Sequence, residues 1–325
     1  MNKVVKWVLV SVGVIATLAA SGVGYLFAAF PKAPAPEGLK VTPTPEHLSR
    51  GEYLAHHVTV CMDCHAERDW SRYSGPPKAG TLGHGGEHFT REMGLPGDFF
   101  SRNITPGGVG GWTDGELARA ITSGVTRDGR AMFPIMPYPY YRHLCDRDLQ
   151  AIIAYLRTLP GTNKTFPESE LDFPVNLIVR TLPEGPEPWS CSNPGSPEYG
   201  KYLTTIAGCP ECHTKQEKGR VIGERFAGGW RFPLPQGGHV TSKNITPDPE
   251  TGIGKWSREQ FVETFRNRGK PEGAFPVKPG EAQTLMPWNM YGGMTAEDLG
   301  AIYDHLRTVP AVKNTVPGFE PPAKG

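Results

Sequence analysis

The sequence predicts an all-α protein in which an N-terminal transmembrane helix precedes two related helical domains. Three observations support this prediction: a charge-free apolar stretch near the N-terminus, a five-residue pattern that occurs twice, and helical spacing of apolar residues in both halves. Long runs of alternating apolar and polar residues, which mark half-buried strands, are not found. The 40 glycines and 33 prolines indicate loop-rich domains, whose cores a large bound cofactor would help to fill.

The predicted membrane anchor covers residues 1–31. Trp7 to Phe30 contains no charged residue, and its 24 positions exceed the roughly 20 that cross a bilayer. A cleaved secretory signal is the alternative, but its apolar region usually has only about 7–15 residues. Lys3 and Lys6 hold the N-terminus in the cytoplasm in either case. We therefore expect a single-pass protein of the bacterial inner membrane whose body faces the periplasm.

The charge balance of the chain argues against binding to nucleic acid and says little about other partners. Lysine and arginine total 34 and aspartate and glutamate total 33, so the chain has no general attraction for nucleic acid.

The body consists of a repeat. Residues 136–160 align without a gap on residues 286–310, and "SRNITP" in the first half corresponds to "SKNITP" in the second. Self-similarity of this kind predicts two domains from one ancestral unit. Their predicted bounds, with those of the segments around them, are a Pro-rich spacer at 32–44, domain 1 at 45–160, a Pro-rich linker at 161–194, domain 2 at 195–312 and a tail at 313–325.

Helix signals recur in both halves. Capping boxes, which mark helix N-termini, are predicted at Ser49–Glu52, Thr113–Glu116 and Ser257–Gln260. The last helix of each half has apolar residues at i, i+3, i+4 and i+7, namely Leu149, Ile152, Ile153 and Leu156, and then Leu299, Ile302, Tyr303 and Leu306.

The five-residue pattern is "CMDCH" in the first half and "CPECH" in the second. Residues three apart face the same side of a helical turn, so each cysteine pair can reach both vinyl groups of one porphyrin. The histidine that follows can then ligate the iron, and Cys-x-x-Cys-His is the haem c attachment signature. The prediction is two covalently bound haem c groups, attached through Cys61, Cys64 and His65 and through Cys209, Cys212 and His213.

Two other readings of the pattern are weaker. A zinc site needs four ligands, and neither half offers a second clustered Cys/His pair. A thioredoxin-like dithiol needs a βαβ context, which the sequence does not show.

The sixth iron ligand is predicted from the repeat. Met136 and Met286 both open a Met-Pro-aromatic segment and lie at matching positions. Thioether sulfur favours ferrous iron and leaves no open coordination site, which suits an electron carrier. Met62 and Met93 are further candidates in the first half. Three methionines have no methionine at the matching position and are expected to pack instead: Met132, Met290 and Met294. Four histidines that could compete have no partner in the repeat: His84, His88, His143 and His239.

Several longer segments carry a family resemblance. "NITPDPETGIGKW", "DGRAMFPIMPYPYY", "AIIAYLRTLP" and "LDFPVNLIVR" resemble the cytochrome c subunits of membrane-bound periplasmic alcohol, aldehyde and gluconate dehydrogenases, over residues 45–312. The resemblance implies class I cytochrome c folds, Met136 and Met286 as distal ligands, and Trp112 and Trp256 near haem propionates. It also implies electron transfer from a partner dehydrogenase toward quinone or a terminal oxidase. That family commonly has three such motifs, and this chain has two.

The predicted function is therefore electron transfer and not catalysis. Expected partners are redox proteins, such as a periplasmic or membrane dehydrogenase, an oxidase or another cytochrome, and the chain could also be a subunit of such a complex. The alternative is a dihaem redox enzyme, for example a peroxidase or a thiosulfate-oxidising cytochrome. Such an enzyme needs one haem with a labile or unusual distal ligand, whereas both Met-Pro-aromatic segments are intact here.

Two cysteines lie outside the motifs. Cys145 occupies the expected N-cap position of the last helix of domain 1, where domain 2 has Thr295, and Cys191 lies in the linker. Unpaired cysteines in an oxidising compartment tend to pair, so a Cys145–Cys191 disulfide is predicted.

Some features have two interpretations. The Asn-Ile-Thr sequences at Asn103 and Asn244 match a glycosylation site, but their place in the repeat favours a structural role. Three arginines could pair with haem propionates or could be ordinary surface residues: Arg127, Arg130 and Arg268.

Overall fold

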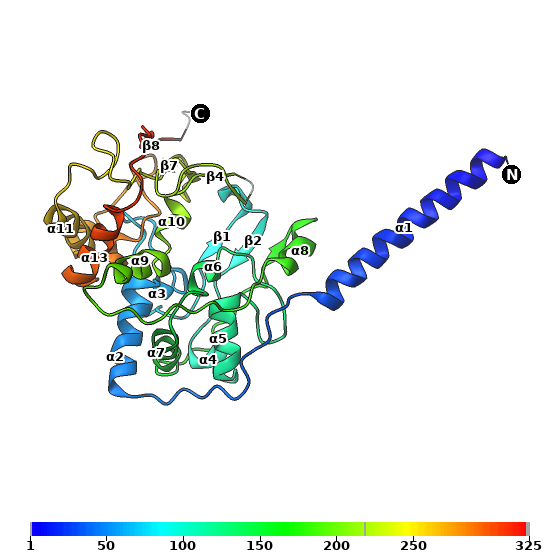
Figure 1. Cartoon of the computed structure of the whole chain (residues 1–325), viewed down its shortest axis with the longest axis horizontal. Helices are drawn as coiled ribbons and strands as arrows, with labels where there is room; N and C mark the ends of the chain where they lie inside the picture. The colour runs from blue at the N-terminus through cyan, green and yellow to red at the C-terminus, as the bar shows by residue number, and fades with distance from the viewer. Residues whose placement is uncertain (1, 218, 323–325) are drawn as a thin grey trace.

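The long N-terminal helix stands apart from the rest of the chain in the computed structural model, which describes residues 2–217 and 219–322. Helix α1 (Lys3–Ala29) leaves the body on one side and has no buried residue (Figure 1). The other α-helices are α2 (Pro45–Tyr53), α3 (Cys61–Cys64), α4 (Pro106–Val109), α5 (Asp114–Ser123), α6 (Tyr138–Tyr141), α7 (Asp146–Leu156), α8 (Val175–Ile178), α9 (Pro197–Ile206), α10 (Cys209–Cys212), α11 (Arg258–Gly269), α12 (Trp288–Tyr291) and α13 (Ala296–Leu306).

Among the described residues, four helical segments are not α-helical. A π-helix, η1 (Leu54–Val58), continues directly from α2. The 3-10 helices are η2 (Arg91–Met93), η3 (Val179–Thr181) and η4 (Pro271–Gly273).

The body also contains short strands, which is a departure from the all-α prediction. In the part of the chain that the structure describes, three small antiparallel sheets have the orders β1-β2-β3, β4-β5 and β6-β7-β8. Each strand has two to four residues, too few to produce the alternating pattern by which strands are recognised in a sequence. Their bounds are β1 His88–Phe89, β2 Gly97–Phe100, β3 Glu170–Leu171, β4 Gln216–Glu217, β5 Arg220–Val221, β6 Arg231–Pro233, β7 His239–Thr241 and β8 Phe319–Glu320.

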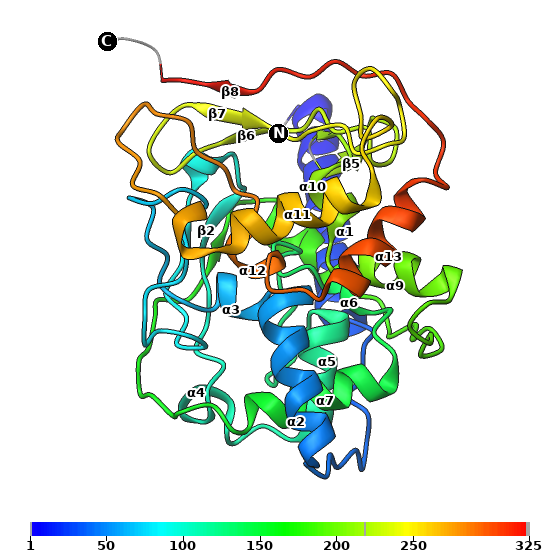
Figure 2. The ribbon, with the colours of Figure 1, turned by 90° about the vertical axis from the view of Figure 1, so that its left-hand side faces the viewer.

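Each half of the body is built on a crossing of its first and last helices. In the first half α2 packs on α7, and in the second α9 packs on α13 (Figure 2). Glycine permits the close approach in both places. A Cβ on Gly51 would collide with the carbonyl oxygen of Ala151, and one on Gly200 would collide with that of Ala301. The core that surrounds these crossings includes the apolar residues predicted from helical spacing in α7 and α13.

The helix caps test three of the sequence predictions. The capping boxes at Thr113 and Ser257 are confirmed. The one predicted at Ser49 is wrong, because α2 begins earlier, at Pro45. Thr44 is the N-cap there, and its hydroxyl accepts the His47 amide. Proline at the first helical position presets the backbone for a start at that point.

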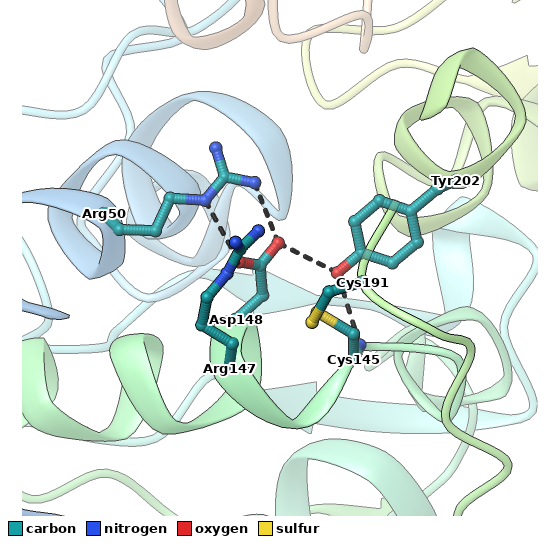
Figure 3. The surroundings of a disulfide bond; sticks show 6 residues. All are labelled: Arg50, Cys145, Arg147, Asp148, Cys191 and Tyr202. Atoms are coloured by element: carbon teal, nitrogen blue, oxygen red, sulfur yellow. Dashed lines mark hydrogen bonds and ion pairs between the residues drawn. A yellow bond between two sulfur atoms is a disulfide. The ribbon is translucent and has the colours of Figure 1, made fainter. Parts of the chain in front are cut away.

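The predicted disulfide is confirmed. Cys145 is bonded to Cys191, with their Cα atoms 5.2 Å apart, and it ties the linker to the start of α7 (Figure 3). Cys145 is the N-cap of α7 but its side chain makes no capping hydrogen bond. At the matching position of α13, the Thr295 hydroxyl accepts the Asp298 amide at 3.1 Å.

The two halves exchange a pair of equivalent contacts. Tyr53, from α2, donates a hydrogen bond to Asp298 of α13 at 2.6 Å. Tyr202, from α9, donates to Asp148 of α7 at 2.9 Å (Figure 3). Each hydroxyl also accepts the amide of the residue that caps the other half's helix, at 3.2 and 3.3 Å. We call these two tyrosine–aspartate contacts, Tyr53–Asp298 and Tyr202–Asp148, the tyrosine clasps.

Each aspartate of the clasps is also held from within its own half. Arg50 makes a two-pronged ion pair with Asp148, at 2.8 and 3.1 Å (Figure 3). At the equivalent place in the second half, Tyr199 donates to Asp298 at 2.9 Å. Both carboxylates are buried, so each needs several donors to offset the loss of water.

Candidate haem-binding site

Both Cys-x-x-Cys-His motifs adopt the same backbone. Each cysteine pair spans one four-residue turn, α3 or α10, and the histidine ends the turn. Cys61, Cys64 and Cys209 are partly buried and Cys212 is exposed, and all four are free thiols. Burial raises the pKa of the Cys64 and Cys209 thiols to about 12. Neutral, unpaired thiols fit thioether attachment better than thiolate coordination of a metal.

A zinc site at these cysteines finds no support in the surroundings. Within residues 2–217 and 219–322, no three or more His, Cys, Asp or Glu side chains gather in a way that could hold a metal ion.

The motif histidines are oriented alike. His65 Nδ1 lies 2.7 Å from the carbonyl oxygen of Arg102, and His213 Nδ1 lies 2.7 Å from that of Lys243. A carbonyl partner requires the proton on Nδ1 and leaves Nε2 as the basic nitrogen, which is how proteins prepare an imidazole for a metal. Burial lowers the pKa of both imidazoles, which favours their neutral, ligating form. The residues present therefore fit an iron ligand on the Nε2 side.

The carbonyls that orient the histidines come from the "SRNITP" and "SKNITP" segments. Asn103 and Asn244 hold these segments: each side-chain oxygen accepts from the threonine two residues later, and each amide donates to a carbonyl at 2.7 Å. Both asparagines are buried. The structural interpretation is therefore the right one, and the glycosylation interpretation fails because neither amide is accessible.

The methionine segments are tied to the motifs by two equivalent tyrosines. Tyr141, at the end of α6, donates to the carbonyl of Thr59, and Tyr291, at the end of α12, donates to that of Ala207 at 2.5 Å. Each carbonyl lies two residues before the first motif cysteine. Met136 and Met286, just before these short helices, are partly buried against the core.

Five of the competing side chains are occupied elsewhere. Met62, Met290 and Met294 are buried in the core. His143 packs against Trp189, with ring centroids 4.7 Å apart and the rings tilted by 30°. His88 stacks on Phe100 at 4.1 Å.

The arginines that could have met propionates have protein partners. Arg127 lies 3.5 Å from Glu116, and Arg130 pairs with Glu168. Arg268 lies over the Tyr73 ring, 5.3 Å from its centroid. Trp112 packs against the core, whereas Trp256 is 38% exposed.

Several known proteins with similar sequences are named as cytochrome subunits. The chain is 29% identical over 305 residues to the fructose dehydrogenase cytochrome subunit of Gluconobacter japonicus, and 28% identical over 283 residues to the cytochrome c subunit of a quinone alcohol dehydrogenase of Gluconobacter oxydans. These matches cover 86% and 82% of this chain. The chain spans only 57% and 55% of the lengths of those relatives. No protein-family model matches the chain.

A third relative decides the family. It is a dihaem c-type cytochrome of Cereibacter sphaeroides, 30% identical over 278 residues, and the match covers 82% of this chain and 86% of the relative. The chain belongs to the dihaem c-type cytochromes. Proteins of this family carry covalently bound haem c and transfer electrons.

The second methionine segment is supported by contacts from the other half of the cytochrome. Sequence reasoning missed these contacts. Ser74, in a loop of the first half, donates to the Met286 carbonyl at 2.6 Å, and the Ser74 amide donates to Gln283 at 2.7 Å. Burial, together with the nearby carboxylate of Glu211 within "CPECH", raises the pKa of Tyr140 in the first methionine segment. Ser74 carries no sequence signal, but the paired tyrosines 141 and 291 do, since they match at the repeat offset.

One acidic group lies inside the first motif. Asp63 is buried and pairs with Arg68 at 3.2 Å. Burial raises the pKa of the Asp63 carboxyl to about 6, although the charge of Arg68 opposes this. The cytochrome thus places a titratable group beside its first cysteine pair and a more exposed glutamate, Glu211, at the same position of the second.

Proposed function

We propose that this cytochrome is a membrane-anchored electron carrier with two class I cytochrome c domains, at 45–160 and 195–312, and two haem c groups. Cys61 and Cys64 attach one haem, and Cys209 and Cys212 attach the other. His65 and Met136 would hold the first iron, and His213 and Met286 would hold the second. The observation that carries the proposal is that Nδ1 of His65 and Nδ1 of His213 each donate to a backbone carbonyl, which leaves Nε2 of each ring as the basic nitrogen.

The bound haems supply a reversible one-electron couple. The protein's own residues fix how that couple behaves. The Arg102 and Lys243 carbonyls keep each imidazole neutral and aligned. The Tyr141 and Tyr291 hydroxyls hold each methionine segment to the loop before its motif. If Met136 and Met286 hold the two irons together with the motif histidines, no position would be left for a substrate, so the proposed role is transfer and not catalysis.

The membrane attachment is proposed from α1. Its 27 residues have a mean hydropathy of 2.0 in their most apolar window, and none is buried against the body. A signal sequence passes the same test, but the apolar stretch is longer than a usual signal region. We propose a retained, single-pass anchor in the bacterial inner membrane, with the haem domains in the periplasm and residues 32–44 as a spacer.

The proposed electron donor is a dehydrogenase. Two relatives bear the names of cytochrome subunits of fructose and alcohol dehydrogenases, and a third that of gluconate 2-dehydrogenase. Electrons would pass on toward the respiratory chain through an oxidase, quinone or another cytochrome. Contacts with such partners should be brief and small in area.

The test is to replace the two methionines one at a time. Met136→Ala and Met286→Ala should each abolish the sulfur-to-iron charge-transfer absorption of one ferric haem and lower one reduction potential. The buried neighbours Met62→Leu and Met294→Leu are matched controls and should change neither. Intact mass should show two haems in the wild type and in all four variants.

Two results would contradict the proposal. If wild-type ferric protein binds cyanide rapidly at one haem, that haem has an open site and the dihaem-enzyme alternative is correct. If Met136→Ala and Met286→Ala leave the absorption unchanged, the distal ligands lie elsewhere.

A further inference from the structure

An exposed apolar surface of the cytochrome lies beside the end of the N-terminal helix. The linker segment 173–182 contains α8 and η3 and carries three exposed apolar side chains. Phe173 is 79% exposed, Ile178 51% and Leu182 40%. Figure 1 shows α8 on the side of the body from which α1 departs. We call Phe173, Ile178 and Leu182 the linker patch.

The linker patch belongs to a fixed part of the chain. Just before it, β3 pairs with β2, and Arg91 forms an ion pair with Asp172 at 2.9 Å. Within it, Val179 is buried. Beyond it, Arg142 pairs with Glu184, and the Cys145–Cys191 disulfide follows. The exposure of the three apolar side chains is therefore imposed by the fold, since the backbone is held on both sides.

Arg180 joins the linker patch directly to α1. Its guanidinium donates to the carbonyl oxygens of Phe30 at 2.6 Å and Phe27 at 3.4 Å. It also lies over the Phe27 ring, 4.4 Å from the centroid. A cation at this place satisfies carbonyls that the last helical turn leaves unpaired and complements the negative end of the helix dipole.

The depth of this junction follows from the length of α1. A 27-residue helix extends for about 40 Å, which exceeds the roughly 30 Å of hydrocarbon in a bilayer. The end of α1 therefore lies in the headgroup layer. The residues there are those that favour an interface: Tyr25 and Phe30 in edge-on contact, and Lys32 over the Phe30 ring.

We propose that the linker patch is a second membrane contact, seated in the headgroup and upper acyl region beside α1. The inference rests on the proposed retention of α1 as an anchor. Its basis is the continuity of the linker patch with the end of that helix through Arg180, together with the fixed exposure of large apolar side chains at the same level. Residues of this kind insert into the interface when a neighbouring anchor already holds them there. Two points of attachment would fix the orientation of the haem domains over the membrane.

The experiment uses the full-length haem-loaded cytochrome in nanodiscs of phosphatidylcholine and phosphatidylglycerol. Single cysteines are introduced as Phe173→Cys, Ile178→Cys, Leu18→Cys and Glu263→Cys and are labelled with the fluorophore NBD. Leu18 lies within α1, and the exposed Glu263 lies on α11, across the body from α1 (Figure 1). The readout is the ratio of emission in doxyl-lipid nanodiscs to that in plain ones, which cancels quenching by the haems.

We expect the labels at 173 and 178 to lose most of their emission to lipids with a shallow doxyl group. The label at 18 should respond to deep doxyl groups, and that at 263 to neither. A matched control carries Ile178→Cys together with Phe173→Ser and Leu182→Ser. Its label should lose much of the quenching, since the apolar side chains that insert have gone while α1 remains.

Contrary outcomes separate the two proposals. If the label at 18 is quenched but those at 173 and 178 behave like the label at 263, the anchor stands and the linker patch inference is overturned. If the label at 18 is also unquenched, both are overturned. Shielding of position 178 only after membrane proteins are added would show a protein partner and would also overturn the lipid contact.

Discussion

The two halves of the cytochrome enter their haem motifs by different routes. Between the clasp tyrosine and the first motif cysteine, the first half has one residue more than the second. The π-helix η1 accommodates this extra residue, whereas α9 runs on without a bulge. In the bulge His57 lies against the second half, with Nδ1 2.9 Å from the Met290 carbonyl. The π-helix thus accommodates the extra residue locally, and the clasp tyrosine and the first motif cysteine keep equivalent positions in the two halves.

The residue before each motif shows a second difference. Val60 and Gly208 both have left-handed backbones, with φ of 45° and 66°. Glycine adopts this conformation without cost, while a β-branched residue does not. The first half therefore retains strain at the place where the second has none. The halves also differ at the last helix, where Cys145 exchanges a capping bond for a disulfide.

The largest expected effect concerns that disulfide. Removing it in the double variant Cys145→Ser/Cys191→Ser should lower the free energy of unfolding by about 3 kcal/mol, since the bond closes a long loop of the unfolded chain. The residues are 46 apart in sequence. Urea unfolding of wild type and variant under oxidising conditions measures the difference. No change in either the midpoint or the slope would mean that the bond constrains nothing.

The second prediction concerns the residue that precedes each Cys-x-x-Cys-His motif. Gly208→Val should cost about 2 kcal/mol, because a side chain in the left-handed region clashes with its own backbone. Val60→Gly should change stability by less than about 1 kcal/mol, since relief of strain is offset by the greater freedom of the unfolded chain. Thermal unfolding of both variants tests this. Equal costs for the two changes would contradict the difference between the halves.

The third prediction concerns the tyrosine clasps. Tyr53→Phe and Tyr202→Phe should each destabilise by about 1–2 kcal/mol, because a buried carboxylate loses a donor. Tyr53→Phe should cost more, since Asp298 keeps only the neutral Tyr199 whereas Asp148 keeps Arg50. Chemical denaturation gives both values. The opposite order of costs would refute the argument.

The smallest expected effect is on acid stability. Burial alone raises the pKa of the Asp148 carboxyl, but hydrogen bonds and the charge of Arg50 outweigh it and lower that pKa below its usual 3.8. A lowered folded-state pKa stabilises the protein above pH 3.8, and this contribution disappears as the pH falls through the folded-state value. The variant Asp148→Asn should therefore lose less stability than wild type between pH 5 and pH 2. Parallel acid-unfolding curves for the two would contradict the prediction.

Sequence reasoning predicted much of this cytochrome because its signals are local. Helix starts such as Thr113 depend on residues three apart. The repeat offset likewise selects Met136 and Met286, whose role as iron ligands stays a prediction. The Cys145–Cys191 pairing was also predictable, since only two cysteines remained outside the motifs. The start of α2 was missed because Thr44 with Pro45 outcompeted the capping box farther along.

What sequence reasoning could not predict depends on the approach of distant segments. The clasps join residues more than fifty positions apart, and nothing near Tyr53 or Asp298 marks them as partners. The short strands escaped notice because two-residue ladders such as β3 on β2 have no periodicity of their own. Ser74 likewise supports Met286 only because a loop of one half reaches the other.

The reciprocity of the clasps has a consequence for how the two halves stay together. Each half offers the other a hydroxyl and receives one in return, which is the geometry of a closed dimer with two-fold symmetry. Two separate polypeptides paired in this way would come apart on dilution. Joined in one chain, they face each other at a high effective concentration that no dilution can reduce, so the spacing of the two proposed haem sites would be the same in a crowded compartment and in a dilute cuvette.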